Sequence, residues 1–342
     1  MPEPIEPRLT CNARESVRTK PGMYFGGIGV FGVEQMLSEL VSNGIDEFLA
    51  GRASELQVRL SDEVIEVSDD GAGVAFGAEI KEGVASLIRL HFTRSADDHA
   101  PHIHLHGAVA GGLAAVNAAS SYFKFQTWQN GQRWEQEFRR GVPERAACIV
   151  RDEAGRGTRI TLTPDASIFG PVSLSRGSVR ARLLEAVHLF PGLTVRFQEE
   201  AFYAPGGLAE LAWLHYRVFA HGLPYRSPPS VFHFQGKVDE VTLAVVALGT
   251  ADDGQPVWNS WVNGSRTIGG THCEGFHDAL CDVRWKPSVV LLHVVVHDPR
   301  YAGPVKDCLE VPAIRPQIAQ GILPALRQFC REQRLGRYRR PI

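Results

Sequence analysis

Apolar residues recur at three- and four-residue spacing over residues 33–51, which is the pattern of an amphipathic helix. The apolar positions are Val33, Met36, Leu37, Leu40, Val41, Phe48 and Leu49, and Gly51 follows where a C-terminal cap is expected. Glu39, Asn43 and Asp46 are spaced four and then three apart, so they project from one stripe of this helix. A carboxylate one turn from a carboxamide can hold a water beside a divalent cation, although such a stripe is more often a solvated face.

Two strands are predicted directly after this helix. Residues 55–60 and 64–68 are rich in strand-forming residues, and the second run leads into Asp69-Asp70-Gly71-Ala72-Gly73. An acid followed by paired glycines gives a tight turn, whose carboxylate can face a pocket rather than solvent.

The same periodicities predict the remaining elements. Helices are expected at 84–90, 113–120, 179–189, 208–219, 273–282 and about 313–333. Strands are expected at 122–128, 133–138, 157–165, 193–198, 238–248, 257–262 and 289–296, the first two joined by the hairpin signal Asn130-Gly131. The mixture predicts an α+β protein with a domain boundary near residues 200–206.

Composition places the chain among ordinary globular proteins. Its 342 residues, 44% hydrophobic and 22% charged, suit one large or two medium domains with a sizeable core. No apolar run approaches the roughly 18–20 residues of a membrane span. The first residues do not have the layout of a signal peptide, so we expect a cytoplasmic protein without a membrane contact.

Two sets of residues could bind metal. Six cysteines are scattered without C-x-x-C spacing, which predicts free thiols rather than a zinc knuckle or a disulfide framework. His102, His104 and His106 would share one face of a strand and could bind a transition metal, although polar histidines in a loop are the simpler interpretation.

The formal net charge of −2 gives no chain-wide attraction to DNA. The exception is a basic stretch near the C-terminus that contains Arg327, Arg331, Arg334, Arg337, Arg339 and Arg340. Cations that complement the dipole of an exposed helix end are one interpretation. A contact to DNA phosphates or to an acidic partner is the other.

The order of these motifs resembles the ATP site of the GHKL ATPases: a helix with E-x-x-x-N, then D-x-G-x-G, then a glycine-rich loop before another helix. Residues 17–26, VRTKPGMYFG, resemble the V-R-x-R-P-G-M-Y-I-G signature of the type II topoisomerase ATPases of the gyrase B kind. Residues 263–276, NGSRTIGGTHCEGF, resemble the transducer segment of that family, which contains G-G-T-H-x-x-G-F.

The resemblance implies a fold and a domain order. An N-terminal arm at residues 1–16 would precede a GHKL ATPase domain at 17–205, with the Bergerat fold, a mixed sheet covered by helices. A transducer domain like domain 2 of ribosomal protein S5 would follow at 206–342. No E-G-D-S-A motif of a DNA-cleavage domain is present, so we do not expect this chain alone to cut DNA.

The resemblance also implies an ATP and Mg²⁺ site. Glu39 would be the general base, and Lys306 would offset charge on the γ-phosphoryl group. The implied ATP-binding residues are Asn43, Asp46, Asp69, Gly71, Gly73, Gly107, Gly111, Gly112 and Thr158, with Asn43 as the Mg²⁺ ligand. Asp69 and Thr158 would hydrogen-bond the adenine.

The phosphate-binding lid of the family, of the G-L-H-G-V-G type, can be aligned in two ways. Leu105-His106-Gly107 matches L-H-G if three residues are inserted after it, whereas Gly107, Ala110 and Gly112 occupy the glycine positions without a gap. In either alignment, backbone N–H groups would cradle the phosphates.

Several positions depart from the family pattern. Ser42 stands where an Asp is usual, Ala72 replaces the Arg of D-G-R-G and Ala75 replaces the Pro that follows. Gln129 stands where gyrase B chains commonly carry another Arg. Since those two arginines contribute to aminocoumarin binding in the family, we expect this chain to bind novobiocin weakly. Lys306 keeps its leucine neighbour but loses the glutamine of Q-T-K-x-x-L.

The sequence therefore predicts a gyrase B-like ATPase that forms a homodimer on binding ATP and drives a separate partner. The alternative is a non-catalytic, nucleotide-binding regulatory or inhibitor-evading homologue of gyrase B. A third interpretation, a dinucleotide-dependent oxidoreductase, rests on residues 27–32, GIGVFG, but the preceding residues make a poor buried strand.

Overall fold

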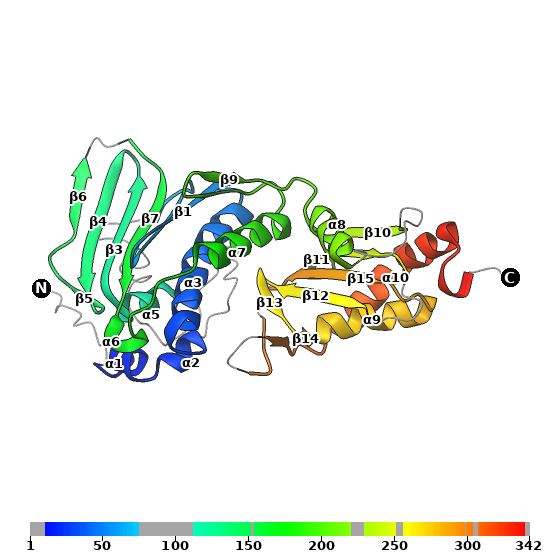
Figure 1. The fold of residues 1–342 in the computed structure, drawn as a ribbon. Helices are drawn as coiled ribbons and strands as arrows, with labels where there is room; N and C mark the ends of the chain where they lie inside the picture. The colour runs from blue at the N-terminus through cyan, green and yellow to red at the C-terminus, as the bar shows by residue number, and fades with distance from the viewer. Residues whose placement is uncertain are drawn as a thin grey trace, which may run out of the picture. The chain divides into compact units, whose positions relative to one another are not determined.

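The computed structural model describes residues 11–74, 112–151, 154–219, 229–250, 256–297, 299–303 and 307–338. The chain divides into two compact units. The first comprises Met1–Leu184 with Leu193–Phe202, and the second comprises Glu185–Gly192 with Tyr203–Ile342. Each unit has its own sheet and its own core (Figure 1).

The first unit is built on a nine-stranded mixed sheet with the order β5-β4-β3-β7-β2-β1-β8-β9, and β6 also pairs with β4. The strands are β1 (Glu55–Ser61), β2 (Val64–Asp69), β3 (Ser120–Gln129), β4 (Gln132–Arg139), β5 (Val142–Pro143), β6 (Cys148–Arg151), β7 (Gly157–Pro164), β8 (Thr194–Phe197) and β9 (Glu200–Phe202). β1 and β8 run parallel, and the other described pairs run antiparallel. β2 and β7 are therefore neighbours, which brings the ends of two distant segments together.

Helices cover one face of this sheet (Figure 1). α3 (Gly29–Leu49) and α5 (Gly112–Ala118) pack on the strands, and α7 (Arg176–Leu189), whose last residues belong to the second unit, contacts α3. The short helices α1 (Cys11–Thr19), α2 (Pro21–Phe25) and α6 (Ala166–Phe169) gather at the lower end of the strands in Figure 1. α3 lies directly on β1, because a Cβ at Gly44 would stand 1.9 Å from Leu56 Cδ2. The buried face of α3 includes Met36 and Leu40, so its polar stripe is turned away from the core.

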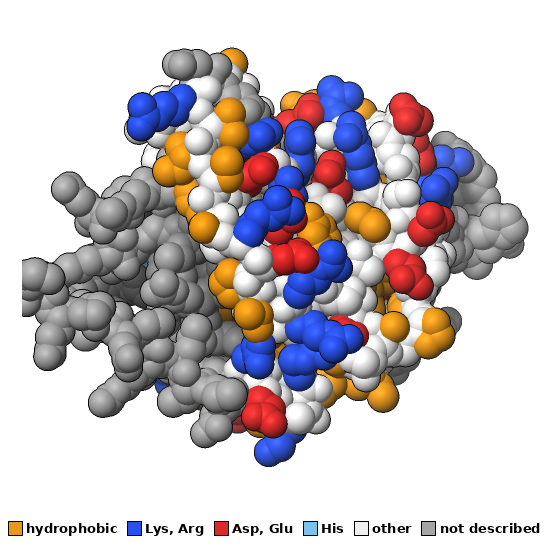
Figure 2. Space-filling view, turned by 90° about the vertical axis from the view of Figure 1, so that its left-hand side faces the viewer, with side chains coloured by type: hydrophobic (Ala, Val, Ile, Leu, Met, Phe, Trp, Pro, Cys, Tyr) orange, Lys and Arg blue, Asp and Glu red, His pale blue; other side chains and the backbone are white. Residues whose placement is uncertain are grey.

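The other face of the sheet carries charges of both signs. Lys124 on β3 lies 3.3 Å from Glu135 and 3.4 Å from Glu137 on β4, and Arg145 pairs with Glu137. Figure 2, which shows the side where β4 and β6 lie, has Lys and Arg side chains interspersed with Asp and Glu. Such a mixed surface gives no single-sign field for a nucleic acid.

The second unit contains a five-stranded sheet with the order β10-β11-β15-β12-β13 and a short parallel pair, β14-β16. The strands are β10 (Val231–Val238), β11 (Val241–Leu248), β12 (Val257–Val262), β13 (Ser265–Thr267), β14 (Gly269–Gly270), β15 (Val289–Val295) and β16 (Cys308–Leu309). The helices are α8 (Leu208–Phe219), α9 (Thr271–Val283), α10 (Ile314–Gln333) and the 3-10 turn η1 (Gly336–Tyr338). α8 lies on one face and α9 with α10 on the other (Figure 1), which explains why β15 is apolar throughout most of its length.

The described elements confirm the α+β class, and most predicted helices and strands are present with shifted ends. Two differences have a clear cause. The run predicted as a strand at 238–248 is the end of β10 and the whole of β11, because the chain turns at Asp239, which has φ of +52°. Residues 11–16 of the predicted arm form part of α1, whereas residues 1–10 and the helix predicted at 84–90 lie outside the described residues.

None of the helices that the structure describes is both long and apolar enough to span a membrane. The cysteines at 148, 273, 281, 308 and 330 are free thiols, as their spacing predicted.

Candidate nucleotide site

Asp69, the last residue of β2, has its carboxylate fixed by two hydrogen bonds. The Gly71 N–H donates to Oδ1 at 2.8 Å, and the Thr158 hydroxyl, from the neighbouring strand β7, donates to Oδ2. Burial raises the pKa of Asp69 to about 6, although the hydrogen bonds from Thr158 and Gly71 favour the ionised form. At neutral pH the group is therefore a partly buried, oriented acceptor.

Glycines let the backbone approach Asp69 closely. A Cβ at Gly71 would stand 2.6 Å from Asp69 Oδ1, and a Cβ at Gly157 would stand 2.0 Å from the Asp69 carbonyl oxygen and 2.9 Å from Oδ1. Gly73 has φ of +75°, and a Cβ there would stand 2.2 Å from the Trp128 carbonyl oxygen. Any larger residue at these positions would crowd Asp69 or push the loop away from β3.

The loop after Asp69 is anchored at both ends. Asp70 accepts hydrogen bonds from Ser54 N at 2.7 Å, from the Ser54 hydroxyl at 2.7 Å and from Glu55 N at 2.8 Å. Beyond Gly73, Val74 N donates to the buried Thr127 hydroxyl on β3 at 2.7 Å. The loop is thus fixed between the start of β1 and β3.

The polar stripe predicted on α3 is present. Glu39, Asn43 and Asp46 are all partly buried. The hydrogen bond to Glu47 raises the pKa of Arg52, and the nearby charge of Asp46 raises it further. Glu39 faces the start of α5, because a Cβ at Gly112 would lie 3.8 Å from Glu39 Oε2. The structure thus brings Gly112 to Glu39, and Asp69, Gly71, Gly73 and Thr158 to one another.

Several predicted site residues lie outside the described residues. They are Gly107, Gly111 and Lys306, together with the histidines at 102, 104 and 106. Among the residues that are described, no group of three His, Cys, Asp or Glu side chains is placed to hold a metal ion.

Sequence reasoning missed Glu47, Arg52 and Arg156, which contact the Asp70–Gly73 loop or its supports. Glu47 had a signal, since it follows Asn43 by four residues and so extends the polar stripe of α3. Arg156 had none, because its partners Gly71 and Arg52 are 85 and 104 residues away in the chain.

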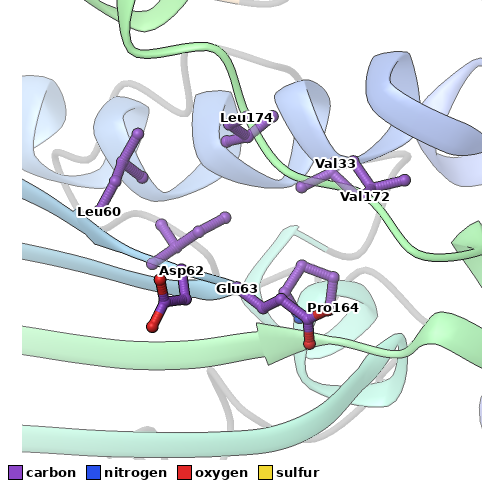
Figure 3. A pocket seen from close by; sticks show the side chains of 8 residues that line it. Val33, Leu60, Asp62, Glu63, Pro164, Val172 and Leu174 are labelled. Carbon is purple, nitrogen blue, oxygen red and sulfur yellow. The ribbon is translucent and has the colours of Figure 1, made fainter.

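A small pocket lies elsewhere in the first unit, between α3 and the β1–β2 turn (Figure 3). It is lined by Val33, Leu60, Asp62, Glu63, Ile65, Pro164, Val172 and Leu174. Its volume of about 10 Å³ admits one water molecule at most, so it is not a ligand site.

The C-terminal arginines are partly engaged within the second unit. Arg327 and Arg337 both bind Asp282, and the guanidinium groups of Arg331 and Arg337 lie over the Tyr338 ring. Arg339 and Arg340 lie outside the described residues.

Comparison with known proteins agrees with this geometry. Residues 30–168 match the family described as histidine kinase-, DNA gyrase B-, and HSP90-like ATPase. The DNA gyrase B protein of Thermus thermophilus is 33% identical over 283 residues, covering 78% of this chain and 43% of that protein. The DNA gyrase B protein of Rickettsia conorii is 26% identical over 359 residues, covering 93% of this chain and 43% of that protein. The chain therefore spans less than half the length of these relatives.

Solved structures resemble the chain over most of its length. The 43K ATPase domain of Thermus thermophilus gyrase B, solved in complex with an aminocoumarin, has a TM-score of 0.73 at 26% identity. The match covers 94% of this chain and 91% of that chain. The gyrase B protein of Myxococcus xanthus has the same TM-score at 23% identity, and the match covers 93% of this chain and 96% of that chain. At this identity the likeness supports the fold alone. The chain is therefore a divergent, gyrase B-like member of the GHKL ATPases.

Proposed function

We propose that the chain binds ATP through its first unit and hydrolyses it with Mg²⁺. The observation that supports this best is the oriented carboxylate of Asp69, which Thr158 and Gly71 N hold and which the backbone of Gly71 and Gly157 approaches closely. Adenine presents an exocyclic amine, and an ionised, partly buried carboxylate is a strong acceptor for it. The site therefore fits the base of ATP.

The side-chain oxygens on α3 also suit Mg²⁺ as ligands. This ion takes oxygen ligands and is usually held by one or two protein groups together with substrate phosphates. Asn43, one turn from Glu39, offers one such oxygen, and a cage of protein carboxylates is not required. When bound, the ion would neutralise phosphate charge.

The protein groups would then divide the work. Asp69 and Thr158 orient the base, Asn43 holds the ion, and Glu39 takes a proton from the attacking water. Lys306 would offset charge on the γ-phosphoryl group, as its match to the family motif implies.

Steady-state Mg-ATP turnover of the wild-type chain and of Glu39→Gln tests this proposal. A positioned base contributes roughly 10²–10⁴-fold, so turnover should fall by about that factor while ATP still raises the Tm. Glu34→Gln is the matched control, because Glu34 lies on the same helix and pairs only loosely, at 3.8 Å, with Arg182. Equal turnover in Glu39→Gln and wild type would refute the role of Glu39.

The second unit would act as the transducer domain, and ATP would bring two chains together as a homodimer. Sedimentation velocity with a non-hydrolysable ATP analogue should show a dimer that is absent without nucleotide. A monomer under both conditions would contradict this part of the proposal.

A second candidate is a binding protein without turnover, which would regulate a gyrase-like partner. Ser42 and Ala72, which depart from the family pattern beside the site, favour it. An ATP-dependent rise in Tm without turnover in the wild-type chain would support this candidate over the first.

A further inference from the structure

The loop Asp70–Gly73, anchored at its two ends by Asp70 and Val74, has a further support between them. Ala72 N donates a hydrogen bond at 3.2 Å to Oε2 of Glu47, the residue that extends the polar stripe of α3. The Glu47 carboxylate is therefore a third anchor of the loop, between those of Asp70 and Val74.

Arg52, just beyond the end of α3, fixes that carboxylate. Its Nε donates to Oε2 at 2.9 Å and its Nη2 donates to Oε1 at 2.6 Å, so the guanidinium and the carboxylate meet fork to fork. The side chains of Arg52 and Glu47 are 28% and 18% exposed, which limits screening by water. Paired, charge-assisted bonds of this kind set an orientation as well as a distance.

Arg156, immediately before β7, makes a second connection between Arg52 and the loop. Its Nη2 donates to the Arg52 carbonyl oxygen at 2.8 Å, and its Nε donates to the Gly71 carbonyl oxygen at 3.3 Å. The next residue, Gly157, lies against Asp69, so this arginine also places the start of β7 relative to the loop.

We propose that Arg52 and Arg156 are positioning residues of the nucleotide site, which hold the Asp70–Gly73 loop through Glu47 and the Gly71 carbonyl. They supply from two other parts of the chain the guanidinium that gyrase B-like sequences carry within the loop, at the position of Ala72. This inference rests on the proposed function, because it concerns how the chain selects and holds the adenine base.

The two arginines act on the base and not on the phosphates. The hydrogen bonds described above connect them to Glu47, to the Gly71 carbonyl and to the Arg52 carbonyl, all beside the loop that follows Asp69. Replacing Arg52 should therefore weaken ATP binding and raise KM while kcat at saturation stays the same. Affinity for inorganic tripolyphosphate, which has no base, should stay the same.

The test is isothermal titration of the full chain with a non-hydrolysable ATP analogue and with tripolyphosphate. We expect Arg52→Ala to lower the affinity for the ATP analogue about tenfold and Arg156→Ala to lower it a few-fold. The bidentate, charge-assisted pair of Arg52 is the stronger of the two contacts. Arg52→Lys should lose part of the affinity, because an ammonium cannot reproduce the fork. Arg59→Ala is the matched control: Arg59 is exposed on β1 and lies 3.6 Å from Glu66, and affinity should not change.

A rescue variant distinguishes a loss of loop positioning from a general loss of stability. Ala72 is exposed and its N–H already lies beside Glu47, so an arginine side chain at this position can reach the same carboxylate. Arg52→Ala combined with Ala72→Arg should recover most of the lost affinity for the ATP analogue. Failure of this rescue, or an equal loss of tripolyphosphate binding in Arg52→Ala, would overturn the inference.

Two further outcomes distinguish the inference from the proposed function. A wild-type chain that binds the ATP analogue, with an Arg52→Ala variant that binds it equally well, overturns the positioning role alone. A folded wild-type chain that does not bind the analogue overturns the proposed function and the inference with it.

Discussion

The hydroxyl of Thr158 donates a hydrogen bond to the carboxylate of Asp69 across the β2–β7 pair. This bond favours the ionised acid, but burial acts in the opposite direction and is the larger effect, so the pKa of Asp69 rises to about 6. The end of β2 therefore carries a carboxylate whose ionised form is disfavoured by burial. A ligand that donates a hydrogen bond to it would stabilise the ionised form.

Asp69→Asn should stabilise the nucleotide-free chain above pH 6. Because the pKa of Asp69 in the fold, about 6, lies above its ordinary value of 3.8, its stabilising contribution is complete below pH 3.8 and is lost as pH rises through 6. That difference corresponds to at most roughly 3 kcal/mol, which the uncharged amide would regain. The Thr158 hydroxyl can still pair with an amide, since it both donates and accepts.

Denaturant unfolding at pH 8 and at pH 4 measures this effect. The variant should be clearly more stable than the wild type at pH 8 and only slightly more stable at pH 4, while losing affinity for ATP. A variant that is less stable at pH 8 would show that burial does not penalise this carboxylate.

Asp165→Asn should have the opposite pH dependence. Burial alone would raise the pKa of this carboxyl, but hydrogen bonds from Ser167 and Arg18 lower it to about 2. The Arg18 contact is 2.6 Å long, and Arg140 adds another at 3.0 Å. The stabilisation is therefore present above pH 3.8 and is lost as pH falls through 2.

At pH 7 we expect Asp165→Asn to lower the free energy of unfolding by roughly 2 kcal/mol. The same denaturant titrations should show this loss shrinking between pH 4 and pH 2. If the loss of stability did not change with pH, its cause would be the removal of the cap that Asp165 provides for α6 and not the removal of the Asp165 charge.

The site could be predicted from sequence as far as its motifs are local. Asp69, Gly71 and Gly73 lie within five residues, and the strand and turn pattern around them already places a carboxylate at the end of a strand. The contacts of Arg156 depend on how β7 lies against β2, which periodicity does not encode. The supports of the loop therefore became visible only in the fold.

Two elements were missed because local composition does not mark them. β10 was missed because its turn into β11 uses Asp239 and Glu240 rather than a glycine or proline, and Val238 and Val241 on either side resemble one continuous strand. α1 was missed because it is short and few of its residues are apolar, although Val17 is fully buried. In both cases tertiary contacts decide what local composition leaves open.

Gly44→Ala should destabilise the first unit, although alanine is the better helix former. The added Cβ would stand 1.9 Å from Cδ2 and 3.1 Å from Cγ of Leu56, which is fully buried and has little room to move. Overpacking of this kind costs about 1–3 kcal/mol, against a gain of about 1 kcal/mol in helix propensity. Because α3 carries Glu39 and Asn43, its displacement should also weaken ATP turnover.

Gly22→Ala is the matched control, since a Cβ there has no neighbour within 4 Å. Its free energy of unfolding, measured by denaturant titration, should equal or slightly exceed that of the wild type. Equal stability of Gly44→Ala and Gly22→Ala would mean that α3 does not lie as close to β1 as the structure places it.

Acid should destabilise the second unit through His293 on β15. Burial lowers the pKa of this histidine to about 3, although a hydrogen bond with the Leu189 backbone opposes the shift, and Gly264 N donates to its Nε2 at 3.3 Å. The ring is therefore neutral, with Nε2 as acceptor. Its stabilising contribution is complete above the ordinary value of 6.5 and is lost progressively as pH falls toward 3.

Between pH 7 and pH 5 this loss amounts to about 2 kcal/mol for His293. His293→Gln keeps an acceptor and a donor but cannot take up a proton, so its free energy of unfolding should fall less over the same interval. Fluorescence of the buried Trp261, which lies opposite His293 in the β12–β15 register, reports the transition. His272, whose pKa burial lowers to about 4, remains in both chains, so the difference between them reports His293 together with its repulsion by charged His272. Identical pH dependence in the two chains would exclude protonation of His293 as a cause of the acid loss.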